Sequence, residues 1–173
     1  MDGIGGAASI ISIATAGVQI SIKLITLATQ ISTASERISS IGNDVSLTSG
    51  VLQQLGELMT QKSADDNAGI SIFSQGGLET TKTSASMCQR IFEEIDTAMK
   101  KASEQLRGKG RFIGGKIKLS RTEKAKWPFL QPSIESLRID LREAKGTLML
   151  ILQVTTLAFS KRMTELYAFL INL

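Results

Sequence analysis

The chain has 173 residues, of which 42% are hydrophobic and 21% are charged, and its formal net charge is +4. This balance excludes a wholly disordered chain, because disordered chains combine few apolar residues with a high net charge. A chain of this length can bury a self-sufficient core, so we predict one domain over residues 1–173. Only two prolines occur, which predicts long, uninterrupted helices.

The composition also disfavours enzyme chemistry. The chain has no histidine and a single cysteine. It therefore lacks the commonest general base and the usual metal ligands, and we expect no catalytic residue, no metal site and no cofactor. Cys88 falls within a helical pattern of apolar residues, where a small buried side chain is the expected role.

Residues 4–31 predict a first helix whose apolar residues fall on more than one face. One set comprises Ile4, Ala8, Ile11, Val18, Ile22 and Ile25, and a second set, turned away from it, comprises Ile10, Ile13, Ile20, Leu24 and Leu27. A helix that is apolar all round lies either in the centre of a bundle or in lipid. Residues 3–22 carry no charge and have the length of a membrane span. Their Ile and Val contribute only about −2 to −4 kcal/mol to insertion, and the serines and Gln19 oppose it, so we expect insertion to be conditional.

Small residues are the second unusual feature of this helix. Glycines in a helix interior cost about 1 kcal/mol each relative to alanine, which a purely structural helix has little reason to accept. Ala8, Ser12 and Ala16 stand four residues apart, a spacing that lets helices approach closely in lipid. We therefore predict a membrane-inserting face made of Ile4, Gly5, Ala8, Ile11, Ser12, Ala16 and Val18. The alternative is close helix contact inside a soluble bundle.

The second helix is expected over residues 35–62, with apolar residues at three- and four-residue intervals. Residues 65–69 form a turn-rich cluster, and Ser74 is an N-cap candidate for a third helix. Helical periodicity in this third helix continues to about Arg107.

A glycine-rich, basic connection follows the third helix. Ten basic residues lie between Lys100 and Lys126 against two acidic ones, a local excess of +8. Polybasic segments gain about 1 kcal/mol per Lys or Arg near an anionic leaflet. We predict binding to anionic lipid or to an acidic partner through Lys109, Arg111, Lys116, Lys118, Arg121, Lys124 and Lys126. A solvated loop that only keeps the domain soluble is the alternative.

Two other interpretations of this connection are not favoured. Gly110, Gly115 and Lys116 match the spacing of a P-loop, but Ile117 stands where a Ser or Thr would hold magnesium, and no strand precedes the motif. Nucleic acid is not an expected partner either, because aromatic residues for base stacking are scarce and no docking motif is present.

The last helix is expected to begin with Pro132 and to run towards Leu166. Residues 146–160 carry no charge and are therefore predicted to form the centre of the bundle. Before this helix, Ser120 and Glu123 form a capping box for a short helix that Pro128 would stop. Acidic residues of the third and last helices stand among Lys and Arg, so we expect a solvated face for Glu93, Glu94, Glu135, Asp140 and Glu143. The fold class predicted is an all-α four-helix bundle with long helices and a short extra helix in the connection before the last one.

Four strings of the sequence carry a family resemblance: MDGIGGAA at residues 1–8, ISIFS at 70–74, KLSRTEKAKWPFL at 118–130 and LREAKGTLML at 141–150. They resemble the fungal N-terminal domain of STAND, or NOD-like-receptor-type, proteins, a family similar to the HeLo and HeLo-like domains. The resemblance implies an effector similar to the four-helix executioner domain of animal necroptosis. Such an effector is released by a nucleotide-binding sensor and acts in programmed cell death and heterokaryon incompatibility. It also implies a cytoplasmic protein that is recruited to the plasma membrane on activation, with a C-terminal sensor module in the full-length protein.

From the residues and the resemblance together, we expect a non-enzymatic effector domain that oligomerises and uses its apolar N-terminal helix to associate with or permeabilise membranes. Anionic lipids and further copies of the chain are the expected partners. The alternative, from a different class, is a signalling or scaffold domain that self-associates or binds a partner helix and does not meet lipid.

Overall fold

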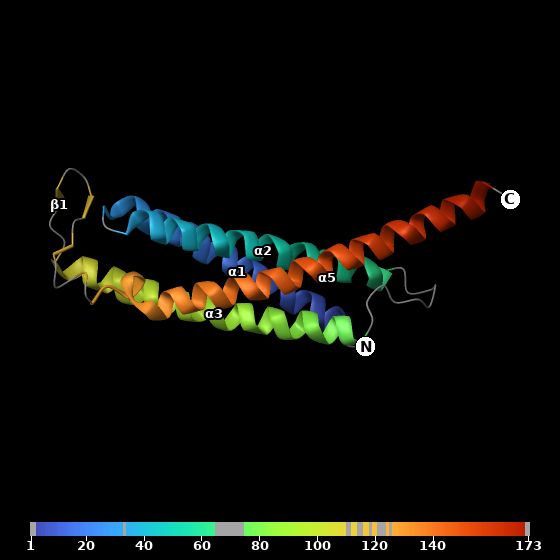
Figure 1. The fold of residues 1–173 in the computed structure, drawn as a ribbon, viewed down its shortest axis with the longest axis horizontal. Coiled ribbons are helices and arrows are strands. Elements are labelled where there is room, and N and C mark those ends of the chain that lie inside the picture. The colour runs from blue at the N-terminus through green and yellow to red at the C-terminus, as the bar shows by residue number, and fades with distance from the viewer. Residues whose placement is uncertain are drawn as a thin grey trace.

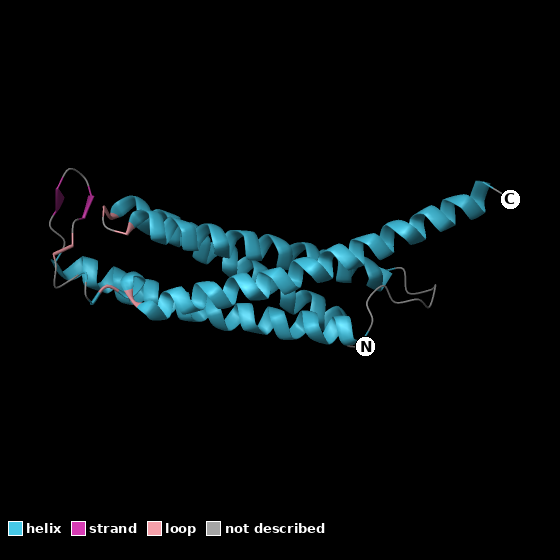
Figure 2. Cartoon of the chain, viewed as in Figure 1, coloured by secondary structure: helices cyan, strands magenta, loops and turns pink. Residues whose placement is uncertain are grey.

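The computed structural model describes residues 3–32, 34–64, 75–109, 112–113, 116–117, 119–120, 124 and 126–171. Within this part of the chain, four long helices form an all-α bundle, as Figures 1 and 2 show. Two short paired strands lie in the connection before the last helix. The helices are α1 (Gly3–Gln30), α2 (Ser35–Ala64), α3 (Gln75–Lys109) and α5 (Pro132–Ile171). The predicted fold class is confirmed, and the expected Ser74 N-cap lies outside the described residues.

The connection between α3 and α5 is anchored to the bundle by aromatic residues. Its β1 (Phe112–Ile113) and β2 (Lys116–Ile117) pair antiparallel. Further along, the 3-10 helix η2 (Pro128–Leu130) buries Phe129, and the preceding Trp127 is fully buried. The Lys124 amide donates to the Ser120 carbonyl at 2.9 Å. This bond spans four residues, as in an α-helix, and lies where the short extra helix was expected. Glu123, the other half of the proposed capping box, lies outside the described residues.

Helices α1 and α5 each pack against both α2 and α3, whereas α2 and α3 contact each other little. The contact between α1 and α2 is the most extensive of the bundle. The turn between these two helices places Ala34 at φ 64°, a conformation that favours glycine, and the Ser35 hydroxyl donates to the Ala28 carbonyl at 2.9 Å. This turn therefore holds α1 and α2 as a tight antiparallel pair.

The core consists of the facing apolar stripes of the four helices together with Trp127 and Phe129. Cys88 lies in this core with no exposed surface, and burial raises the pKa of its thiol to about 12. The expected role of Cys88 as a small buried side chain is confirmed. Leu141 and Leu148 of α5 are fully buried in the same core.

The prediction that residues 146–160 form the centre of the bundle is wrong for one face of α5: Leu148 and Thr155 are buried and Leu152 packs against the core, but the opposite face is open. Leu150, Val154 and Leu157 are 64%, 68% and 73% exposed. The reason is helical spacing: at about 3.6 residues per turn these three side chains share the face of α5 that points away from the buried Leu148 and Thr155. In addition, the red C-terminal end of α5 projects beyond the ends of its neighbours (Figure 1). An uncharged stretch was thus mistaken for a buried one.

Candidate functional site

Helix α1 has a buried inner face and an open outer face. Of the two apolar sets in its sequence, the set that includes Ile10, Ile20 and Leu24 is buried against the rest of the bundle. The other set faces outward, with Val18, Ile22 and Ile25 at 39%, 60% and 42% exposure. The sequence could not distinguish these faces, because both are apolar at helical spacing.

The predicted membrane-inserting residues lie on the outer face or at its edge. Gly5, Ala8, Ser12, Ala16 and Val18 are exposed, and Ile11 is half-buried. The side chain of Ile4 lies outside the described part of the chain. Close helix contact inside the bundle, the alternative explanation for the small residues, therefore does not account for the stripe formed by Ala8, Ser12 and Ala16.

The outer face contains hydroxyl groups, but two of them are satisfied within the helix. Thr15 Oγ1 donates to the Ile11 carbonyl and Thr26 Oγ1 to the Ile22 carbonyl, each at 2.9 Å. A hydroxyl bonded in this way needs no other partner for its proton, which lowers the cost of transferring the helix to lipid. Among the described residues, only the helix over Gly5–Gln30 is long and apolar enough to cross a membrane. Core helices of soluble proteins can be equally long and apolar. The open outer face of α1 therefore distinguishes a membrane helix from a core helix better than its length and composition do.

Gly17 is explained by close helix contact inside the bundle, the alternative considered for the small residues of this helix. A Cβ at this position would lie 2.5 Å from Phe92 Cε2 and would also collide with Ser49 Oγ. Gly56 of α2 has the corresponding role opposite Ile11, whose Cγ1 would be 2.5 Å from an added Cβ. These two glycines let α1 approach its neighbours closely. By contrast, nothing lies within 4 Å of the position that a Cβ on Gly5 would take.

Polar contacts add little to the docking of α1. The Ser21 hydroxyl donates to the Gly42 carbonyl of α2 at 2.8 Å, inside the core. Lys23 Nζ lies 3.8 Å from Asp96 Oδ1 of α3, but its side chain is 58% exposed, and exposed pairs are worth only about 0–1 kcal/mol. Asp96 also pairs with Lys100 at 2.7 Å, and the hydrogen bond to this carboxylate raises the pKa of Lys100. Apolar packing is therefore what keeps α1 in place.

The predicted basic residues occupy the connection between α3 and α5. Lys109 ends α3 and Lys116 begins β2, but their side chains, with those of Arg111, Lys118 and Arg121, lie outside the described part. Lys126 is exposed, and its carbonyl accepts a hydrogen bond from Gln105 at 3.4 Å. Lys124 is half-buried, so it is less available to a partner than expected from the sequence.

The structure does not bring the two predicted sets together. The start of α1 and the β-hairpin lie at opposite ends of the bundle (Figure 1). At about 1.5 Å per residue, the 28 residues of α1 separate these ends by about 40 Å. The other end of α1 is nearer to the basic connection, since β2 contacts α1. A membrane bound through the basic end would therefore lie close to the turn between α1 and α2.

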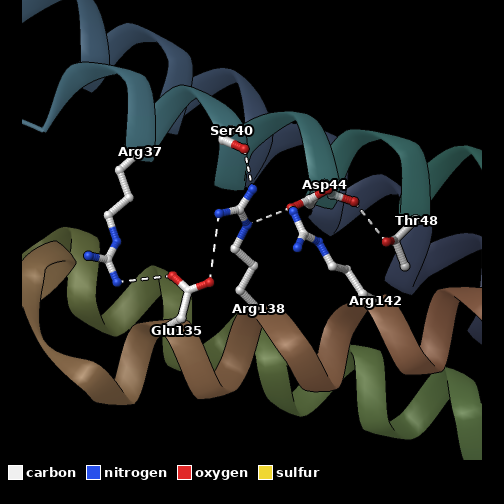
Figure 3. A network of polar contacts seen from close by, with 7 residues as sticks. All are labelled: Arg37, Ser40, Asp44, Thr48, Glu135, Arg138 and Arg142. Carbon is white, nitrogen blue, oxygen red and sulfur yellow. Dashed lines mark hydrogen bonds and ion pairs between the residues drawn. The ribbon is translucent and has the colours of Figure 1, made fainter.

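A cluster of charged residues that the sequence did not suggest holds α5 against α2 (Figure 3). Arg138 Nε donates to Asp44 Oδ2 at 2.8 Å, and the side chains of Arg138 and Asp44 are only 15% and 13% exposed. Arg138 Nη2 also donates to the Ser40 hydroxyl, and Arg142 Nη2 lies 3.2 Å from the same Asp44 oxygen. One α2 carboxylate thus binds two α5 guanidinium groups.

Glu135 extends this network and corrects an expectation. Its carboxylate accepts a hydrogen bond from Arg37 Nη2 at 3.0 Å and lies 3.8 Å from Arg138 Nη1, so it links α2 and α5 instead of standing on a merely solvated face. The one available signal in the sequence was the position of Asp44, which lies between the apolar residues Ile41 and Val45 of α2. A carboxylate so close to a buried stripe needs a cationic partner.

In the described part of the chain, no group of three or more acidic or cysteine side chains could hold a metal ion. Comparisons of the chain with protein-family models, with curated proteins and with solved structures find no match. The resemblance to the fungal N-terminal domains therefore stays a prediction from the sequence strings, and the function has to be argued from the geometry of α1 and the basic connection.

Proposed function

We propose that this chain is a non-enzymatic membrane effector in which α1 leaves the bundle and inserts into a lipid bilayer. The observation that carries the proposal is the open outer face of α1, a helix long and apolar enough to span a membrane with Lys23 as its one charge among the described residues, together with the exposed small-residue stripe of Ala8, Ser12 and Ala16. In lipid, such a stripe allows helices from several copies to pack closely. In the bundle, Ser12 and Ala16 border an open groove between α1 and α3 and stay exposed, so close helix packing does not require small side chains there.

The energetics of release favour a conditional process. In the bundle the inner face of α1 is buried, and in a bilayer it would again be surrounded by hydrocarbon, so its apolar side chains stay out of water in both states. The remaining gain is smaller than the about −2 to −4 kcal/mol of all the Ile and Val residues together, because Ile10, Ile13 and Ile20 belong to the buried inner face. It must offset the lost packing at Gly17 and the lost hydrogen bond of Ser21. We infer that a trigger or self-association is needed.

The basic connection supplies the proposed recruitment step. Its location beside the α1–α2 turn means that an anionic membrane bound there would meet the hinge about which α1 could swing away from α2. Attraction of about 1 kcal/mol per basic residue near an anionic surface would hold the domain during this step. The family resemblance is consistent with this sequence of events and adds the proposed context of fungal cell death at the plasma membrane, reached from the cytoplasm.

The proposal is tested by placing charges on the outer face of α1. Ser12→Glu with Ala16→Glu adds two carboxylates to exposed positions, so the fold should be retained. Acidic residues at the centre of a membrane helix cost about 2.5–3.5 kcal/mol each, which together exceeds the estimated gain from insertion. We expect dye release from anionic vesicles to be lost, with an unchanged circular dichroism melt.

The matched control is Ser46→Glu with Gln54→Glu, which makes the same charge change at exposed positions of α2. This variant should release dye like the parent protein. Equal release by the α1 variant and the parent would contradict insertion of α1. If the parent protein neither binds nor permeabilises vesicles under any lipid composition, the alternative role as a signalling or scaffold domain would be favoured instead.

A further inference from the structure

The charge network between α2 and α5 lies beside the turn that joins α1 to α2. Its α2 members are Arg37, Ser40 and Asp44, all within the first ten residues of the helix that begins at Ser35. Arg37 follows three residues after Ala34, the turn residue at φ 64°. The network therefore holds the part of α2 that comes directly after the point about which α1 would swing.

Once α1 has left, α2 depends on α5 for its place in the bundle. Within the described part of the chain, α2 packs mainly on α1 and α5 and contacts α3 little. Departure of α1 therefore leaves α2 attached to the other helices chiefly through α5. The contact between α1 and α2 is the most extensive of the bundle, so its extent alone would predict that α2 follows α1.

The chemistry of the two interfaces of α2 favours the opposite outcome. The α1 side is mostly apolar, with Ile11 against Gly56 and Ile25 against Gly42. The α5 side is charged, because Asp44, only 13% exposed, binds two guanidinium groups of α5. Hydrocarbon can replace the apolar neighbours of α1, since apolar side chains stay out of water in either place. It cannot replace the partners of a carboxylate, because a charge without a partner is costly in lipid.

The charges of α2 also keep this helix in water. Lys23 is the one charged residue of α1, whereas α2 carries five, including Arg37 and Asp44 of the network. Among the described residues, only α1 is long and apolar enough to cross a membrane. α2 could not accompany α1 into hydrocarbon without dehydrating its charges. The boundary that opens is therefore the one between α1 and its neighbours, and the network stays on the water side of it.

We propose that the charge network is an anchor that keeps α2 on α5 when α1 leaves, so that α1 moves alone and α2, α3 and α5 stay assembled. Arg138 and Asp44 form the buried centre of this anchor, and the pair of Arg37 with Glu135 extends it towards the α1–α2 turn (Figure 3). The anchor gives the swing of α1 a fixed point. The inference deepens the release step of the proposed function and rests on it, because it names the helices that stay behind.

The test is hydrogen exchange of the native protein in solution, measured without lipid and resolved by helix. Buried amides exchange through local and sub-global openings, so helices that open together share one opening constant. We expect the opening constant of α1 to be at least about tenfold larger than that of residues 38–48 of α2. Residues 38–48 should exchange together with the buried part of α5 instead.

Asp44→Asn tests the anchor itself. The network is present both in the closed bundle and after α1 has left, so its loss should leave the opening constant of α1 unchanged. The opening constant of α2 should rise about tenfold or more, because hydrogen bonds between charged groups are lost.

Asp96→Asn is the matched control, because it makes the same chemical change at a carboxylate that pairs with Lys23 of α1 and Lys100 of α3. The exposed pair with Lys23 exists only while α1 is docked. Its loss should therefore raise the opening constants of α1 and α2 by the same factor, at most about fivefold. The ratio between the two helices should stay as in the parent protein.

Two results would overturn the anchor. One is a parent protein in which α1 and residues 38–48 share one opening constant, since the two helices would then open together. The other is an Asp44→Asn variant in which α1 opens more easily by the same factor as α2, since the network would then hold both helices as one unit. If Asp44→Asn does not fold, Arg142→Gln removes one guanidinium group from the same carboxylate at a half-exposed position and should give the same pattern on a smaller scale. None of these constants depends on vesicles, so failure of the anchor is distinguishable from failure of α1 to insert.

Discussion

Gly17→Ala tests whether α1 packs as closely on its neighbours as the structure shows. The added Cβ would lie 2.5 Å from Phe92 Cε2, 2.9 Å from Phe92 Cζ, and in collision with Ser49 Oγ. Neither neighbour yields easily, because Phe92 is buried in the core and the Ser49 hydroxyl is held by its hydrogen bond to the Val45 carbonyl at 2.8 Å. Overpacking of a core costs about 1–3 kcal/mol, and three contacts this short point to the upper end.

Helix propensity opposes part of this loss. Alanine is better than glycine inside a helix by about 1 kcal/mol, so the net destabilisation should be about 2 kcal/mol. For a chain of this size, that corresponds to a decrease of about 4–8 °C in the melting temperature, measured by circular dichroism. Gly50→Ala is the matched control, since Gly50 lies inside α2 with nothing within 4 Å of its added Cβ, and it should raise the melting temperature by about 2–4 °C. If Gly17→Ala stabilises the protein as much as Gly50→Ala does, the close approach of α1 is wrong.

Three further predictions concern the bundle. Leu148→Ala should lower the free energy of unfolding by about 2–5 kcal/mol in chemical denaturation, because Leu148 is fully buried. Leu152→Ala should cost clearly less because Leu152 is only half-buried at the edge of the core; equal losses would show that the two side chains are equally buried. Asp44→Asn should cost about 1.5–3 kcal/mol, because it leaves the mostly buried Arg138 without its α2 carboxylate, and a loss below about 0.5 kcal/mol would mean that the network does not hold α5. Cys88 should resist thiol reagents at pH 8 until the protein unfolds, because burial raises its pKa to about 12 and leaves it mostly protonated; rapid labelling of the folded protein would contradict its position in the core.

Periodicity was sufficient to predict the helices, since each of the four long helices observed falls where apolar residues recur every three or four positions. It was not sufficient to predict which face is buried when both faces are apolar, as in α1. That choice depends on shape, because Gly17 and Gly56 remove the side chains that would otherwise keep α1 away from α3 and α2. The open face of α5 was missed for a related reason: an absence of charge does not tell which face of a helix is buried.

The candidate site was predictable in its residues but not in its arrangement. The small-residue stripe and the basic connection can both be recognised as one-dimensional patterns. Their location at opposite ends of the bundle follows only from the parallel course of α1 and α3, which places the start of α1 and the end of α3 far apart. The ion pair between Asp44 and Arg138 joins residues 94 positions apart, and no local spacing relates them.

The central claim, that α1 must leave α2 to act on a membrane, is most directly tested by a reversible cross-link between these helices. An added Cβ on Gly56 would lie 2.5 Å from Ile11 Cγ1, the position that a cysteine sulfur would take, so Ile11→Cys with Gly56→Cys is within reach of a disulfide. Cys88 is buried and would not compete. We predict that the oxidised variant releases no dye from anionic vesicles and that a reductant restores release to the level of the parent protein. Release by the oxidised variant at the level of the parent would contradict the claim that α1 leaves the bundle.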